Sequence, residues 1–373
     1  MNRILLLAPS LAARTGGIAT SCQSVLRLLG EKQEKGEVEC RAFALLPTSD
    51  RTEEVQLNEW SHHHWKHFGA SRMRFSWEAI HEASGWADLV LCMHPNLSQL
   101  QCFVPRFRRP KWIHFIHGTD VWYPLSLLKR HVLARNPSIA FSQFTVDKCR
   151  KFNPWFPEAT VCHLGLPREV PKPTQQDCQQ SLGFSPGRKD ILIVGRLVAS
   201  ERQKGHTELY MAMAEVVKRV PEARLIVVGE GDDLERNQAV AQSTLAPSAI
   251  HFTGYLPPNT LSALYDSVGV FCLPGRQEGF GLVYLEAMRA GLPCVATQAD
   301  AAKEIIQDEV TGRVVTDRDP DALAKALVDL LTDEPKRQRL GEAGRLRFQK
   351  EFQESHFHER LWRHLKKFLP SQP

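Results

Sequence analysis

Short apolar runs recur along the whole chain, and most of them end at glycine or small polar residues that precede a stretch of helical character. This alternation predicts an α/β protein with parallel sheets. In the first half, the predicted strands are residues 4–8, 87–93, 112–118 and 138–142. In the second half they are residues 190–195, 223–229, 249–254, 268–275 and 293–297, with predicted helices at 206–220, 259–268 and 319–333.

Two series of strands in 373 residues indicate two domains, because one domain usually takes about 100–200 residues. We predict Rossmann-like domains at 1–170 and 189–350, joined by a Pro-, Gln- and Ser-rich linker at 171–188. Residues 351–373 contain a basic amphipathic helix that either packs back on the first domain or lies on a membrane. Two such domains predict a ligand cleft where the loops at the carboxyl ends of the strands converge.

Composition favours a globular protein of the cytoplasm. About 43% of the residues are hydrophobic and 24% are charged, and no apolar run approaches the roughly 20 residues that span a bilayer. The apolar start, residues 4–8, reads better as a buried strand leading into a Gly-Gly loop than as a signal peptide. Nine cysteines, an odd number with no Cys-x-x-Cys pair, indicate reduced thiols and neither a disulfide framework nor a zinc site.

The segment at 273–297, LPGRQEGFGLVYLEAMRAGLPCVAT, carries the strongest functional signal. A strand ends at a Pro-Gly turn, Glu278 follows, and Gly279, Phe280 and Gly281 lead into a helix that starts near Leu282 and contains Glu286. Glycines beside a helix N-terminus allow backbone N–H groups to approach an anion. An unpaired Glu286 among apolar neighbours would be costly, and a hydroxyl-rich ligand would satisfy it. If most of the intervening residues are helical, about 12 Å separates the two glutamates, which suits a sugar and a ribose.

A second segment, VGRLVASERQKGH at 194–206, places cations at the ends of elements. Arg196 directly follows the strand that ends at Gly195, and Lys204 precedes a helix. Guanidinium and ammonium groups in such positions suit a diphosphate.

Two weaker signals lie in the first half. Gly16 and Gly17 follow the first strand and open a helix, so their N–H groups suit a phosphate, although an ordinary βα turn explains them as well. His117 ends a strand in the sequence HGTD, which faces the predicted cleft. Asp120 is interpreted only as the cap of the following turn.

Together these motifs resemble the group 1 family of retaining glycosyltransferases, which have the GT-B fold. The matching residues are GRL at 195–197, KG at 204–205, VVGEGD at 227–232 and EGFGLVYLEAMRAGLP at 278–293. They span about 100 residues, with both glutamates in register, whereas the first half matches only in short motifs. One departure is the longer loop VASERQ between Arg196 and Lys204.

The resemblance implies roles for individual residues. Arg196 and Lys204 would bind and stabilise the leaving diphosphate, Glu286 would bind the ribose hydroxyls, and Glu278 would contact the donor sugar. Backbone amides of Phe280, Gly281 and Leu282 would reach the sugar or phosphate, and His117 would lie close to the anomeric carbon.

The resemblance also implies retention of anomeric configuration and a UDP- or GDP-sugar donor, with no other cofactor. The Asp-x-Asp at 317–319 precedes a predicted helix start and is interpreted as a cap, so we expect no metal. The base, the sugar, and the glycan or lipid-linked acceptor stay open. A sugar-nucleotide epimerase of the same fold and a non-catalytic nucleotide-sugar-binding protein remain alternatives.

Two other classes fit less well. A nicotinamide oxidoreductase would require Gly-x-Gly-x-x-Gly after a strand, which the strand-opening loops lack. Nucleic-acid binding is suggested by basic segments at 62–68 and 105–112, but no base-stacking or groove-reading motif accompanies them.

The positive charge is concentrated in the first half. Residues 1–170 hold 21 Lys and Arg against 15 Asp and Glu, whereas the remainder holds 26 against 27. Two explanations stay open: an ordinary basic surface, or peripheral docking on the anionic inner face of the cell membrane. The docking residues would be Arg72, Arg74, Arg106, Arg108, Arg109, Lys111 and Trp112.

Overall fold

The computed structural model describes residues 1–11, 16–46, 65–168 and 182–370, and divides into two units. Unit 1 comprises Met1–Leu164 and Glu354–Pro373, and unit 2 comprises Gly165–Gln353. The expected domain ends at residues 170 and 350 thus differ from the observed boundaries by a few residues. Most of the expected linker, residues 171–181, lies outside the described part of the chain.

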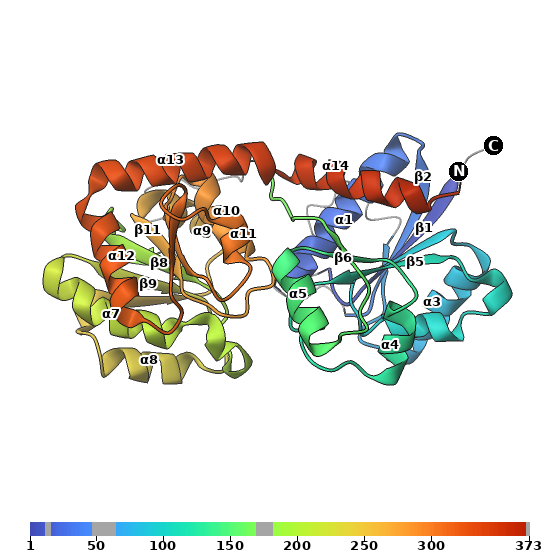
Figure 1. Cartoon of the computed structure of the whole chain (residues 1–373), viewed down its shortest axis with the longest axis horizontal. Coiled ribbons are helices and arrows are strands. Elements are labelled where there is room, and N and C mark those ends of the chain that lie inside the picture. Colours follow the sequence, from blue (N-terminus) through green and yellow to red (C-terminus); the bar gives the residue numbers. More distant parts are fainter. Residues whose placement is uncertain (12–15, 47–64, 169–181, 371–373) are drawn as a thin grey trace. The chain divides into compact units, whose positions relative to one another are not determined.

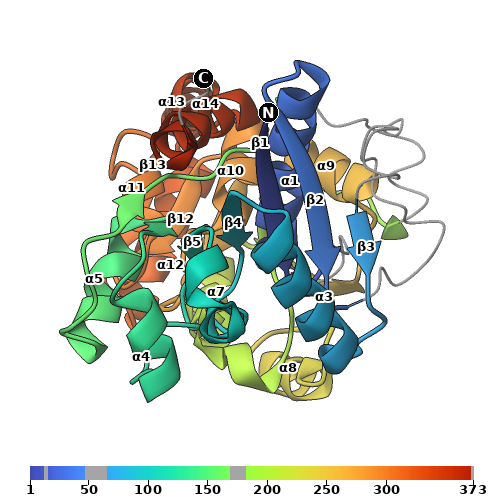
Figure 2. The same ribbon diagram turned by 90° about the vertical axis from the view of Figure 1, so that its right-hand side faces the viewer.

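Unit 1 contains a parallel sheet of seven strands in the order β3-β2-β1-β4-β5-β6-β7. Figure 2 shows this order from β3 at the right-hand edge to β5. The strands are β1 (Asn2–Ala8), β2 (Val38–Ala44), β3 (Trp65–His67), β4 (Leu89–Cys92), β5 (Lys111–Ile116), β6 (Ser138–Ala140) and β7 (Thr160–Val161). Its helices are α1 (Gly17–Glu34), α3 (Arg72–Gly85), α4 (Leu127–Leu133), α5 (Gln143–Phe152) and α14 (Glu354–Leu365), with short 3-10 turns η3 (Ser98–Phe103), η4 (Arg106–Arg108) and η7 (Lys366–Phe368).

Unit 2 contains a parallel sheet of six strands in the order β10-β9-β8-β11-β12-β13. The strands are β8 (Asp190–Val194), β9 (Arg224–Val228), β10 (Ile250–Gly254), β11 (Val270–Leu273), β12 (Cys294–Thr297) and β13 (Gly312–Val315). Its helices are α7 (His206–Arg219), α8 (Leu234–Gln242), α9 (Pro258–Ser267), α10 (Leu282–Arg289), α11 (Ala302–Ile305), α12 (Pro320–Thr332) and α13 (Glu334–Glu351), with 3-10 turns η5 (Ala199–Lys204) and η6 (Pro247–Ala249).

These sheets confirm the predicted α/β class with parallel strands. The first predicted strand, residues 4–8, lies inside β1, whose apolar side chains are almost fully buried. In both sheets the strand order reverses beside the first strand, between β1 and β4 and between β8 and β11. Loops that leave the carboxyl ends of strands at such a reversal part from each other and leave room for a ligand.

The C-terminal helix belongs to unit 1. Phe357, Leu361 and Trp362 are buried on one face of α14, which packs against α1 (Figure 1). Arg27 of α1 donates to Glu354, with Nε 3.1 Å from Oε1. Of the two positions considered from the sequence, packing on the first unit is the one observed.

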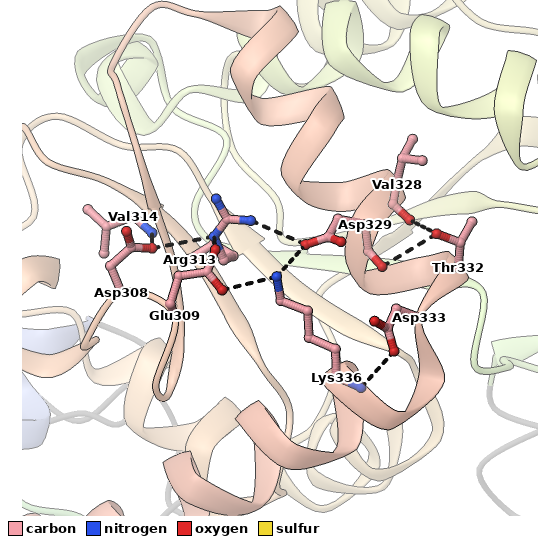
Figure 3. A network of polar contacts seen from close by, with 9 residues as sticks. All are labelled: Asp308, Glu309, Arg313, Val314, Val328, Asp329, Thr332, Asp333 and Lys336. Atoms are coloured by element: carbon pink, nitrogen blue, oxygen red, sulfur yellow. Dashed lines mark hydrogen bonds and ion pairs between the residues drawn. The ribbon is translucent and has the colours of Figure 1, made fainter.

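Ion pairs hold the end of unit 2 together. Arg313 of β13 lies within 3.3 Å of Asp329 on α12, and Lys336 of α13 lies 2.8 Å from the same carboxylate (Figure 3). Both cations also contact Glu309, at 3.1 Å and 3.0 Å. The network joins β13 to α12 and α13.

Candidate functional site

The loop after β8 brings Lys204 back to the end of its own strand. Residues 199–204 form the turn η5, and Gly205 then adopts φ +82°. A side chain at Gly205 would place its Cβ 2.2 Å from the Pro274 carbonyl oxygen, so glycine is needed there. The Lys204 side chain lies over Gly195, because a Cβ at that glycine would be 3.4 Å from Lys204 Cδ. The longer VASERQ loop therefore does not carry Lys204 away from Arg196.

Two predicted residues from different loops meet in an ion pair. Lys204 Nζ lies 3.1 Å from Glu278 Oε1, after β11, and 3.3 Å from Glu201 Oε2, within η5. Arg196 pairs with the other oxygen of Glu201. The structure thus brings Arg196, Lys204 and Glu278 together at the strand-order reversal of unit 2. It adds Glu201, which the sequence motifs did not single out.

Lys204 is positively charged in this setting. Burial alone would lower its pKa, but the carboxylates of Glu278 and Glu201 outweigh burial and raise it. A permanently charged ammonium group at a strand end suits a phosphate ligand.

Glu286 has a partner that the sequence did not reveal. The Tyr265 hydroxyl of α9 donates to Glu286 Oε2 at 2.9 Å. Part of the hydrogen-bonding that a buried carboxylate needs is therefore supplied within the protein. The helix begins at Leu282, so most of the residues between the two glutamates, 282–285 of 279–285, are helical. Burial raises the pKa of Glu286, and the Tyr265 hydrogen bond and Arg289 lower it by less.

The N-terminus of α10 is shaped by Gly281. This residue adopts φ +94°, and a Cβ there would lie 2.5 Å from the Tyr284 ring. No side chain caps α10, and its first turn contains no acid. The Phe280 side chain is buried and meets Phe352 edge-on, with ring centroids 6.4 Å apart. Gly279, which has no side chain, precedes Phe280 on the same loop. A ligand at residues 279–280 would therefore contact the backbone.

His117 follows β5 in unit 1 and is held through its ring. Nε2 lies 2.7 Å from the Met93 carbonyl oxygen, which can only accept, so the proton is on Nε2 and Nδ1 is left as an acceptor. Burial lowers the pKa of His117 against the opposing effect of Asp120. Asp120 accepts from the backbone N–H of His117 at 3.2 Å and of Gly118 at 2.6 Å. This confirms the interpretation of Asp120 as a turn cap.

His94, after β4, was not singled out from the sequence. Its ring stacks on that of His117 with centroids 6.3 Å apart, and burial lowers its pKa. The two histidines directly follow the neighbouring strands β4 and β5, so both lie at the carboxyl ends of the strands. The signal that could have found His94 is its place directly after the predicted strand 87–93.

Gly16 and Gly17 open α1 as expected. Gly16 adopts φ +90° as the N-cap, and its carbonyl oxygen accepts from Ala19 N–H at 3.0 Å. The first turn of α1 contains no acid, which leaves its dipole uncompensated by a carboxylate. Thr15 of the same motif lies outside the described residues.

Three other expectations have structural outcomes. Trp112 is buried with 1% exposure, so its inclusion in a membrane-docking surface is wrong. Asp319 accepts from Ala322 N–H at 2.9 Å and caps α12, as interpreted. Of the basic segment 62–68, residues 62–64 lie outside the described part.

Two further features concern metals and membranes. Within the described ranges, no group of three or more His, Cys, Asp and Glu side chains could hold a metal ion. Across the described helices, none combines the length and apolar character that crossing a bilayer requires.

Comparison with known proteins identifies the segment that carries this site. Residues 174–347, all within unit 2, match the family model described as glycosyl transferases group 1. A GDP-mannose-dependent alpha-(1-6)-phosphatidylinositol monomannoside mannosyltransferase of Mycolicibacterium smegmatis is 31% identical over 245 residues, 61% of this chain and 63% of that protein. A D-inositol 3-phosphate glycosyltransferase of Corynebacterium urealyticum is 33% identical over 169 residues, 43% of this chain and 39% of that protein. The matches span less than two thirds of the length of these relatives.

Solved structures share the fold of almost the whole chain. Anabaena Alr3699/HepE, crystallised in complex with UDP and glucose, superposes with a TM-score of 0.79 at 17% identity and covers 98% of this chain and 100% of its own. A sucrose-phosphate synthase of Thermosynechococcus elongatus also gives 0.79, at 20% identity, with 98% and 99% coverage. These likenesses confirm the predicted GT-B fold.

Proposed function

We propose that this chain, whose residues 174–347 belong to the group 1 glycosyl transferases, transfers a hexose from a nucleotide-diphosphate sugar to a glycan or lipid-linked acceptor. The observation that carries the proposal is the meeting of Arg196, Lys204 and Glu278 where the strand order of unit 2 reverses. Cations placed there suit a pyrophosphate better than they suit a neutral metabolite.

The reaction breaks the bond between the anomeric carbon and a phosphate oxygen, which leaves negative charge on the diphosphate. Arg196 and Lys204 would stabilise that charge, aided by amide groups at the N-terminus of α10. Glu278 would hold the sugar, and Glu286 would accept hydrogen bonds from the ribose. No metal is needed for this stabilisation.

The acceptor oxygen forms the new bond to the anomeric carbon, and its proton passes to the departing phosphate on the same face of the sugar. This sequence retains the anomeric configuration. From unit 1, His117 would meet the sugar, and the Gly16 and Gly17 amides would meet a phosphate. A neutral His117 with Nδ1 unprotonated would accept a hydrogen bond from a sugar hydroxyl.

Whether the donor is a UDP-sugar or a GDP-sugar stays open. The mannosyltransferase relative is GDP-mannose-dependent by name, and the HepE structure contains UDP. A thermal-shift screen with UDP-, GDP- and ADP-sugars tests the proposal, because a ligand that binds only the folded state raises the unfolding temperature. If none of them stabilises the protein at millimolar concentration, the transferase, the epimerase and the nucleotide-sugar-binding alternatives all fail together.

Product analysis then separates the alternatives. NMR of the anomeric proton is expected to show a transferred sugar with the configuration of the donor, and activity is expected to persist in excess EDTA. Conversion of the donor sugar without an acceptor would favour an epimerase instead.

We further propose that unit 1 contacts an anionic membrane, where a lipid-linked acceptor is found. Five large apolar side chains on α3, η3, η4 and α4 are more than half exposed, and η3 contacts both α3 and α4. They are Met73, Trp77, Phe103, Phe107 and Leu127. We call them the apolar surface of unit 1; both helices appear in Figure 2.

Charge supports the same partner. Between residues 98 and 135 the chain has seven Lys and Arg and one acid, Asp120. Arg72, Arg74, Arg106, Arg109 and Lys111 are exposed, whereas the side chain of Arg108 lies outside the described part. Apolar anchors among cations are typical of proteins that lie on anionic lipid.

Co-sedimentation with vesicles of phosphatidylcholine and phosphatidylglycerol tests this contact. Binding is expected at low salt, weaker at high salt, and reduced by Trp77→Ser or Phe107→Ser. Met211→Ser, which removes an exposed apolar residue of unit 2, is the matched control. Equal sedimentation without phosphatidylglycerol, or none at low salt, would contradict docking.

A further inference from the structure

Glu201 is the residue of the site for which the proposed reaction gives no role. One carboxylate oxygen pairs with Arg196, and the other lies 3.3 Å from Lys204 Nζ. These are the two cations proposed to hold the diphosphate. A single carboxylate therefore bridges the positions where two phosphate groups would make their charged contacts.

The local backbone places Glu201 there. Within η5 this residue departs from helical geometry, with φ −121° and ψ 24°, which breaks the turn into two parts. The side chain is 19% exposed, in contrast to 56% for its partner Arg196. Glu201 is thus held inward by the fold of the loop.

The charges of the cluster cancel. Arg196 and Lys204 are balanced by Glu201 and Glu278, so a diphosphate that enters adds negative charge beside two carboxylates. Like charges at close range repel strongly in a partly buried site. Glu201 contacts both cations, whereas Glu278 contacts only Lys204 among them. Glu201 is therefore the carboxylate that competes with a diphosphate for both cations.

The loop also offers this carboxylate another position. A small cavity beside Glu201, with room for about one water molecule, is bordered by His206, Arg236 and Asp233, and Asp233 already pairs with Arg236 at 3.5 Å. His206 Nε2 is buried and has no hydrogen-bond partner among the described residues. Burial lowers the pKa of His206 to about 4, so the ring is neutral near pH 7 and can donate from Nε2.

We propose that Glu201 is an internal counter-ion that pre-positions Arg196 and Lys204 in the empty site and is displaced towards His206 when a diphosphate binds. The inference rests on the proposed function, since it assumes that these two cations receive the diphosphate. Glu201 is a positioning residue that competes with the ligand, and it forms no bond to the reacting atoms.

Calorimetric titration with UDP, GDP and inorganic diphosphate tests the competition. Glu201→Gln keeps the size of the side chain and removes its charge, and it is expected to bind the preferred probe about tenfold more tightly than the natural protein. Glu235→Gln, an exposed glutamate of α8, removes the same charge from the same unit and is expected to leave affinity unchanged. A residue with a merely structural role would weaken binding when replaced.

The outcomes separate the two proposals. If the natural protein binds a probe and Glu201→Gln binds it equally or more weakly, the counter-ion role is wrong and the proposed function stands. If the natural protein binds none of the probes, both fail. Should Glu201→Gln not fold, Glu201→Asp decides, because its shorter carboxylate cannot bridge both cations and is also expected to raise affinity.

Discussion

Lys204 is the residue whose loss we expect to separate catalysis from folding. Its ammonium group is largely buried but is held by Glu278 and Glu201 between loops, outside the apolar core. Lys204→Met is expected to lower kcat by about 10²–10³, the usual effect of removing one group that stabilises the transition-state charge. The unfolding temperature should change little. Steady-state kinetics and circular dichroism check the pair of effects, and a variant with normal kcat would exclude Lys204 from diphosphate stabilisation.

At Glu286, we expect a substitution to raise the stability of the protein while it weakens nucleotide binding. Because burial raises the pKa of its carboxyl, the folded chain holds this proton more tightly than the unfolded chain does. The stability that this group contributes is therefore complete below the ordinary value of 4.5 and is lost as pH rises from there through the higher pKa of the folded state. Glu286→Gln should be more stable than the natural protein near pH 7, and the difference should vanish below pH 4.5.

The same variant should bind nucleotide less well. Loss of hydrogen bonds to a charged group costs about 1.5–3 kcal/mol, or roughly ten- to hundredfold in affinity. Urea unfolding at several pH values and titration with nucleotide measure both effects. A Glu286→Gln protein that binds nucleotide normally would remove Glu286 from the ribose site.

Single residues were predictable where spacing along one segment defined them. Arg196, Lys204 and Glu278 each lie at the end of a strand or the start of a helix, which the sequence shows directly. Tyr265 was not predictable in this way, because it meets Glu286 from a different element. Glu201 was noticed only as part of a longer loop, since nothing in the sequence shows that η5 turns its carboxylate inward.

At the scale of elements, α10 depends on the glycine before it. Gly281 adopts φ +94°, and a Cβ there would lie 2.5 Å from the Tyr284 ring. The Tyr284 hydroxyl also donates to the Leu273 carbonyl oxygen at 2.7 Å, so this ring is not free to move. Gly281→Ala is expected to destabilise unit 2 by about 1–3 kcal/mol and to weaken nucleotide binding.

Urea unfolding followed by circular dichroism measures this cost. Gly187→Ala is the control, because a Cβ at that glycine meets nothing within 4 Å and its φ is ordinary. Equal midpoints for the two variants would show that α10 tolerates a side chain at residue 281.

Strands were predicted where they are continuously apolar and missed where they are not. β1, β8 and β9 are buried on both faces and appear as apolar runs. β2 alternates buried residues with Glu39 and Arg41, and β13 is only four residues long and contains Arg313. Such strands form because they pair with neighbouring strands that are distant in the sequence, and a local sequence pattern contains no information about those neighbours.

At the scale of the whole molecule, the chain leaves unit 1 and returns to it. Leu166 pairs with Gln353 in a parallel bridge, so both crossings lie side by side in unit 2. α14 then completes unit 1 by burying Phe357 and Leu361. The sequence predicted two domains and a last helix that either packs on the first domain or lies on a membrane. In the structure this helix packs on unit 1. A basic amphipathic face does not by itself distinguish a protein surface from a lipid surface.

This division predicts what different probes of unfolding report. All eight tryptophans, from Trp60 to Trp362, fall within unit 1. Because each unit has its own sheet and core, we expect two unfolding steps, with tryptophan fluorescence following unit 1 alone and far-ultraviolet ellipticity following both.

A nucleotide diphosphate held mainly by Arg196, Lys204 and Glu286 should therefore shift the ellipticity step that fluorescence does not show more than it shifts the fluorescence step. At a concentration of 100 times Kd, the stabilisation is about 2.7 kcal/mol, and Lys204→Met should reduce it. A nucleotide that shifted the fluorescence step alone would place its binding site in unit 1. In that case His117 and the Gly16 turn, and not the cation cluster after β8, would hold the diphosphate.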